Sequence, residues 1–179
     1  MTQTESEYKQ VIALCKDVFE KKTKDYGTAW RILRLPSITD QILIKAQRIR
    51  SIQEKGAQKI EEDIRNEFIG IINYSIIAII QESLSENAPL EISVEDLMPK
   101  YEKVADETLQ LLLDKNHDYG EAWRDMRVSS ITDIILMKLY RVKQIEDNKG
   151  KTLISEPVKA NYQDMINYAV FCLIKLKEE

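Results

Sequence analysis

The sequence predicts an all-α fold, a pseudo-symmetric bundle of about six helices made by tandem duplication of a three-helix unit. The first observation is a repeat: residues 21–50 and 114–143 are identical at sixteen of thirty positions without a gap, which indicates an internal duplication. The second is that only 5 Gly and 4 Pro occur among 179 residues. The third is that apolar residues recur at intervals of three and four, the period of an α-helix.

The first helix of each unit is predicted from a stripe of apolar residues at helical spacing. One stripe runs through residues 8–19 and its counterpart through residues 101–112. Gly27 and Gly120 follow the two stripes. Because glycine adopts a left-handed conformation without steric cost, we expect these two residues to close the first helices.

The second helix should begin at position 37 or 39 and end near position 55, and its twin should run from position 130 or 132 to about 147. Serine or threonine occupies each of the four expected starts. Their side-chain oxygens can accept hydrogen bonds from the unpaired amides of a first helical turn.

The third helices are expected at about residues 59–83 and 156–177, and both are apolar around much of their circumference. Helices of that kind lie at the centre of a protein. We therefore expect a first repeat at residues 1–83, a linker at 84–93 and a second repeat at 94–179. The two repeats should pack as one globular unit, because either one alone would leave its third helix exposed.

The composition limits the classes of partner. With 26 basic and 30 acidic residues, net charge −4, the chain lacks the excess of positive charge that a nucleic-acid binder uses, so nucleic acid is the weaker partner. Two cysteines lie far apart without metal-type spacing, which fits a reducing compartment. With neither a signal-like N-terminus nor a run long enough to span a bilayer, we expect a cytoplasmic protein with no membrane contact. The sequence is compatible with a homo-oligomer as well as with a monomer.

A loop motif, Asp-Tyr-Gly-x-Ala-Trp-Arg-x-x-Arg, occurs at residues 25–34 and again at 118–127. Aromatic faces can stack on a base, and guanidinium groups suit phosphate oxygens. The candidates for base stacking or loop formation are Asp25, Tyr26, Trp30, Asp118, Tyr119 and Trp123. The candidates for phosphate binding are Arg31, Arg34, Arg124 and Arg127. Alternatively, the aromatic residues fill the gap between helices while the arginines pair with aspartates.

The second helices carry a second charged motif, Asp-x4-Lys-x2-Arg. It comprises Asp40, Lys45 and Arg48 in one repeat and Asp133, Lys138 and Arg141 in the other. The lysine and the arginine share one helix face beside apolar residues. A positive pair in such surroundings needs a counter-anion, which is either a carboxylate of the third helix or a ligand phosphate.

The third helices carry polar residues on one face. In the second repeat these are Asn161, Asp164, Asn167 and Tyr168, and the first repeat retains Asn73 and Tyr74 but has Glu67 and Gly70 at the other two positions. Carboxylate and amide oxygens on adjacent turns are suitable ligands for Mg²⁺. Because Gly70 replaces Asp164, either one site survives or the repeats build a composite site. Alternatively, Asp164 forms an ion pair with Lys138 or Arg141.

These motifs together resemble the nucleotide modification associated domain 1 family, and the resemblance covers nearly the whole chain as two copies. It implies a role linked to modification of nucleotides or of DNA bases. A looser similarity is to the all-α MazG-like nucleoside triphosphate pyrophosphohydrolases, in which acidic residues on two helices hold Mg²⁺ around a triphosphate. Glu156 and Asp164 would correspond to the acidic set on the later helix.

The leading hypothesis is a nucleotide-binding protein that acts as a Mg²⁺-dependent pyrophosphohydrolase on (deoxy)nucleoside triphosphates. Glu156 and Asp164 would be catalytic and would hold the metal with help from Asp133. In the second repeat, the phosphates would bind Lys138, Arg141, Arg124 and Arg127. In the first repeat, either phosphate binding or a purely structural role is expected for Lys45, Arg48, Arg31 and Arg34. The alternative is a non-catalytic helical binding module with a structural charge network. One observation supports it: the MazG-like group carries a Glu-x-x-Glu pair on its earlier helix, where this chain has Asp133, Lys138 and Arg141.

Overall fold

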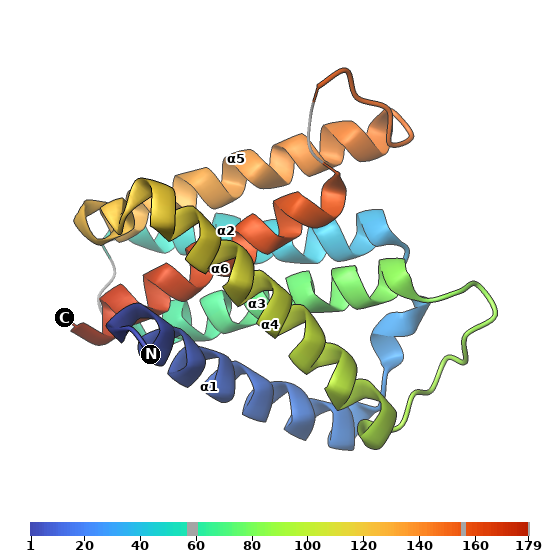
Figure 1. Cartoon of the computed structure of the whole chain (residues 1–179). Helices are drawn as coiled ribbons and strands as arrows, with labels where there is room; N and C mark the ends of the chain where they lie inside the picture. The colour runs from blue at the N-terminus through green and yellow to red at the C-terminus, as the bar shows by residue number, and fades with distance from the viewer. Residues whose placement is uncertain (57–60, 155–156, 179) are drawn as a thin grey trace.

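The computed structural model describes residues 1–56, 61–154 and 157–178, and these residues form six α-helices and no strand (Figure 1). The all-α prediction is therefore confirmed. In chain order the elements are α1 (Gln3–Tyr26), the 3₁₀ helix η1 (Ala29–Ile32), α2 (Leu35–Lys55), α3 (Glu61–Ser83), α4 (Val94–Tyr119), the 3₁₀ helix η3 (Ala122–Asp125), α5 (Val128–Asp147) and α6 (Val158–Glu178). In the part of the chain described, no helix is long and apolar enough to cross a membrane.

The second helices begin two residues before the serines and four before the threonines at which we expected them to start. Helix α2 begins at Leu35 and α5 at Val128. Thr39 and Thr132 lie a full turn inside, where each hydroxyl donates to the carbonyl of the residue four positions earlier, at 3.2 and 3.0 Å respectively. Their side chains therefore bond within the helix instead of capping its first amides. Pro36 is tolerated in the first turn of α2, where its missing N–H would have had no helical partner.

The ends of the first helices agree with the sequence prediction. Gly27 has φ +63° and Gly120 has φ +66°, and the N–H of each donates to a carbonyl four residues earlier. The expected third helices also form, at residues 61–83 and 158–178. Positions 59 and 156, where these helices were expected to begin, lie outside the described residues.

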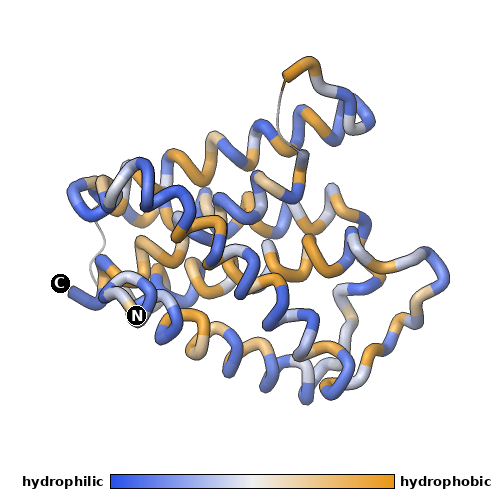
Figure 2. Tube along the Cα trace, in the orientation of Figure 1, coloured by the Kyte–Doolittle hydropathy of each residue, from blue (hydrophilic) through white to orange (hydrophobic). Residues whose placement is uncertain are grey.

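Helices α3 and α6 form the centre of the bundle. They pack against one another, and each also packs against the second helix of its own repeat. The second helices, α2 and α5, contact each other as well. Apolar residues run through α3 and α6 (Figure 2), so burying these two helices supplies much of the hydrophobic stabilisation.

The first helices, α1 and α4, pack against each other and against both central helices, and α4 crosses the bundle obliquely (Figure 1). Two buried hydrogen bonds tie them reciprocally to the opposite repeat. The Tyr8 hydroxyl of α1 donates to Asn167 Oδ1 of α6 at 2.9 Å, and the Tyr101 hydroxyl of α4 donates to Asn73 Oδ1 of α3 at 2.7 Å. Burial raises the pKa of both phenols, so both keep the proton that they donate.

The same asparagines also bind the first helix of their own repeat. Asn73 Nδ2 donates to the carbonyl of Cys15 at 3.0 Å, and Asn167 Nδ2 donates to the carbonyl of Thr108 at 3.4 Å. Each buried amide is thereby satisfied on both sides, as buried polar groups require. These two members of the predicted polar face hold the repeats together.

We expect replacement of Tyr8 or Tyr101 by Phe to lower the free energy of unfolding by about 1–3 kcal/mol, because each change leaves a buried asparagine oxygen without its donor. Tyr140→Phe is the matched control, since Tyr140 is 52% exposed on α5 and should change stability little. Urea unfolding of the three variants measures the differences. Equal stability of all three would contradict the structural role of the Tyr–Asn bonds.

Candidate functional site

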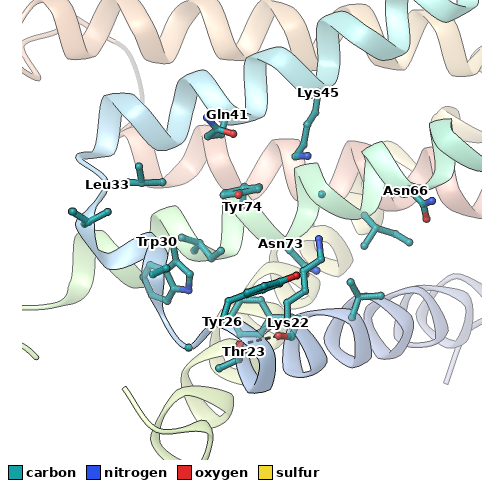
Figure 3. Close-up of a pocket in the computed structure, with 18 residues that line it drawn as sticks. Lys22, Thr23, Tyr26, Trp30, Leu33, Gln41, Lys45, Asn66, Asn73 and Tyr74 are labelled. Carbon is teal, nitrogen blue, oxygen red and sulfur yellow. Dashed lines mark hydrogen bonds between the residues drawn. The ribbon is translucent and has the colours of Figure 1, made fainter. Parts of the chain in front are cut away.

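A cavity of about 700 Å³ lies within the first repeat, between α1, η1, α2 and α3 (Figure 3). We call it the first-repeat pocket. Its wall includes four aromatic side chains, those of Phe19, Tyr26, Trp30 and Tyr74, together with apolar residues of α1, α3 and the segment around η1. Its polar lining includes Gln41 and Asn66. The described residues form two further hollows of similar volume elsewhere on the bundle.

Two lysines point into the first-repeat pocket from different helices, Lys22 from α1 and Lys45 from α2 (Figure 3). Lys45 Nζ lies 5.6 Å from the centre of the Tyr74 ring, within the range of a cation–π attraction. It is 3.8 Å from the carboxylate of Glu67, which accepts a closer hydrogen bond of 2.7 Å from Arg48. Lys22 is exposed and makes no hydrogen bond or ion pair with another residue of the described chain.

Gly70 of α3 leaves room for the Lys45 side chain at the wall of the first-repeat pocket. A Cβ atom at this position would lie 2.8 Å from Cδ of Lys45 and 3.2 Å from its Nζ. The Lys45 side chain therefore lies directly over the bare backbone of α3. A side chain at position 70 could fit only if Lys45 moved.

The corresponding place in the second repeat is filled by Asp164. Its carboxylate accepts hydrogen bonds from Lys115 at 2.8 Å and from Lys138 at 3.0 Å, and its side chain is only 9% exposed. Lys115 and Lys138 lie 93 residues after Lys22 and Lys45. The ion pair with Lys138, one of the two alternatives for Asp164, is therefore the arrangement in the structure.

The loop tryptophans also differ between the repeats. Trp123 is buried, and its ring stacks on Phe171 with a centroid distance of 4.2 Å and an interplanar angle of 3°. Trp30 is half-buried and lines the first-repeat pocket, where Ile77 stands at the position of Phe171. The second-repeat tryptophan thus fits the core interpretation of the loop motif, whereas the first-repeat tryptophan is available to a ligand.

Arg31 and Arg124, the first arginines of the two loop motifs, have structural partners. Arg31 donates to the carbonyls of Pro89 at 3.1 Å and Ala88 at 2.9 Å, so it holds the linker against the first loop. Arg124 lies 4.3 Å from the Trp123 ring centre and donates to Glu7 at 3.0 Å. These contacts account for both guanidinium groups without a phosphate.

Other predicted residues lie outside the first-repeat pocket. Tyr168 packs edge-on against Phe171, and Asn161 donates to the Pro157 carbonyl at 3.3 Å. Arg141 lines a separate hollow on α5. The remaining loop candidates are exposed, namely Asp25, Arg34, Asp118, Tyr119 and Arg127.

The predicted metal ligands are not gathered into one cluster within the described residues. Asp133 is 58% exposed and forms an ion pair with Arg50 of α2, with Oδ1 and Nη1 3.5 Å apart. No group of three or more His, Cys, Asp or Glu side chains in the described ranges could hold a metal ion. Glu156 lies outside those ranges.

Sequence reasoning missed Lys22 and Lys115, although the two are identical in the aligned repeats. That identity was the available signal. It also missed Gly70 as a feature of the site, because a missing side chain carries no chemical motif.

The fold and the site define an all-α protein with two similar halves, one of which holds a cationic, aromatic-lined pocket. The chain belongs to the nucleotide modification associated domain 1 family, whose model matches residues 22–81 and 115–176, one segment in each repeat. Searches of curated proteins and of solved structures found no match. Similarity to MazG-like pyrophosphohydrolases is not shown by these comparisons.

We expect Asp164→Asn to destabilise the protein by roughly 3 kcal/mol, because it leaves the largely buried Lys138 beside Lys115 with no anion between them. Asp133→Asn is the control, since it removes an exposed carboxylate and should cost at most about 1 kcal/mol. Chemical denaturation at neutral pH compares the two. If Asp164→Asn lowers the free energy of unfolding no more than Asp133→Asn does, the ion pairs of Asp164 contribute little to stability.

Proposed function

We propose that this protein binds a nucleotide in the first-repeat pocket, with the base against the aromatic wall and the phosphate facing Lys22 and Lys45. The observation that carries the proposal is the combination of two lysines and four aromatic side chains around one cavity. Its volume of about 700 Å³ falls in the range of pockets that hold small ligands.

The polar groups of the pocket support a ligand of this class. Asn73 is already committed to Tyr101 and to the main chain of α1, so Gln41 and Asn66 are the amides that remain for a base or sugar. Stacking of a base on an aromatic side chain contributes about 1–3 kcal/mol. A lysine–phosphate hydrogen bond contributes about 1.5–3 kcal/mol.

Two further observations support a free nucleotide over a nucleic acid. The family is described as associated with nucleotide modification, which agrees with a ligand built from a base, a sugar and phosphate. The net charge of −4 would repel the long phosphate backbone of a nucleic acid. A mononucleotide needs only the local positive charge of the pocket.

We expect isothermal titration calorimetry with (deoxy)nucleoside mono- and triphosphates to detect binding to the wild-type protein. Lys45→Met should weaken it about 10- to 100-fold, the equivalent of one lost charge-assisted hydrogen bond. Lys55→Met is the matched control, because Lys55 lies on the same helix but does not line the pocket. The absence of binding to the whole panel would refute the proposal.

Whether the protein also hydrolyses the bound nucleotide is a separate question. The ion pairs of Asp164 favour a protein that binds the nucleotide without hydrolysing it. A carboxylate held by two lysines, at 2.8 and 3.0 Å, has its charge already compensated and is a poor ligand for Mg²⁺. A magnesium site would have to draw on Glu156, on Asp133 or on a rearrangement of the Asp164 ion pairs.

We expect no pyrophosphate release above background when the protein is incubated with Mg²⁺ and a panel of (d)NTPs, because Asp164 is compensated by lysines. A coupled phosphate assay measures release by wild type and by Asp164→Ala. Mg²⁺-dependent release by wild type would establish the pyrophosphohydrolase. In that event, undiminished release by Asp164→Ala would remove Asp164 from the mechanism.

A further inference from the structure

We infer that the second repeat is a copy of the ligand site filled by its own side chains. In the first-repeat pocket, the anionic group of the ligand would bind Lys22 and Lys45, as the Asp164 carboxylate binds Lys115 and Lys138 in the second repeat. The aromatic ring of the ligand would stack on Trp30 as Phe171 stacks on Trp123. This inference rests on the proposed function, since it assigns parts of the bound nucleotide to places in the same pocket.

The two sites correspond in space as well as in sequence. Gly70 and Asp164 are each three residues before a buried asparagine, Asn73 in α3 and Asn167 in α6. These asparagines make the same pair of hydrogen bonds in the two repeats, one to a tyrosine and one to a main-chain carbonyl. The third helices therefore have the same register against the first helices, and positions 70 and 164 are structural equivalents.

The two sites differ in where the third helix places its carboxylate: the first repeat has Glu67 where the second has Asn161, and the second repeat has Asp164 where the first has Gly70. Lys115 and Lys138 share the carboxylate of Asp164. Lys45 has the backbone of Gly70 at the same place, and the carboxylate described beside it, that of Glu67, binds Arg48 more closely. Two lysines that face one cavity favour an anion between them. A phosphate, with a charge of −1.5 to −2 near pH 7, satisfies both.

The aromatic residues of the two sites differ in the same way, because a side chain fills the space in the second repeat and not in the first. Phe171 lies parallel to Trp123 at a stacking distance, whereas the shorter Ile77 leaves the Trp30 side of the first-repeat pocket open. Asp164 and Phe171 are seven residues apart on α6, about 10 Å along the helix axis. The second repeat thus outlines an extended ligand with an anionic end and a planar ring, which describes a nucleoside monophosphate better than inorganic phosphate.

Gly70→Asp tests the charge assignment by copying the second repeat into the first. We expect it to abolish binding of nucleoside monophosphates, a loss of at least about 100-fold. It should also raise the Tm of the unliganded protein by about 2–4 °C relative to Gly70→Asn. The asparagine variant adds the same bulk without the charge. A Tm no higher than that of Gly70→Asn would overturn the inference, even if the wild-type protein binds nucleotides.

The converse experiment opens the second site. In Asp164→Gly/Phe171→Ile, calorimetry should find two nucleoside monophosphates per chain where wild type binds one, and the ligand should restore part of the lost thermal stability. A folded double variant that still binds one ligand would contradict the inference. If the variant does not fold, the Gly70→Asp comparison decides. Failure of the wild-type protein to bind any nucleotide would instead refute the proposed function, because the Tm comparison needs no ligand.

Discussion

The arrangement of this bundle depends on two buried asparagine side chains that must each satisfy a donor and an acceptor group. Asn73 and Asn167 do so by binding a tyrosine of the opposite repeat and a main-chain carbonyl of their own repeat. Apolar packing alone would let α1 and α4 slide along the central helices at little cost, since hydrophobic burial is non-directional. A buried amide left unpaired costs about 1–3 kcal/mol, so these bonds select one register.

Once that register is fixed, very few residues decide whether a site is open or filled. Both repeats place two lysines and a tryptophan at equivalent positions, and two of the positions at which the third helices differ decide whether the site is open. Gly70 and Ile77 leave a cavity in the first repeat. Asp164 and Phe171 close it in the second through ion pairs and ring stacking. A shared framework thus carries two chemically different interiors.

The sequence predicted the helices well because their signals are local. Apolar periodicity located all six, and Gly27 and Gly120 marked two ends. The starts of α2 and α5 were missed because a threonine inside a helix and one at its cap look alike until the hydroxyl's partner is known. The site was harder to predict, since Asp164 is compensated by Lys115, 49 residues away in the sequence. Only the fold brings the two together.

The open pocket is a cost that the chain could have removed. Two lysines facing one cavity repel each other, and the second repeat shows that a carboxylate on the third helix neutralises such a pair within the same fold. The fold therefore does not require an open cavity between Lys22 and Lys45. Local destabilisation that a fold does not need is typical of functional sites. The first repeat has an open pocket where the second repeat has a filled site, and this difference is the strongest structural argument that the pocket binds a ligand.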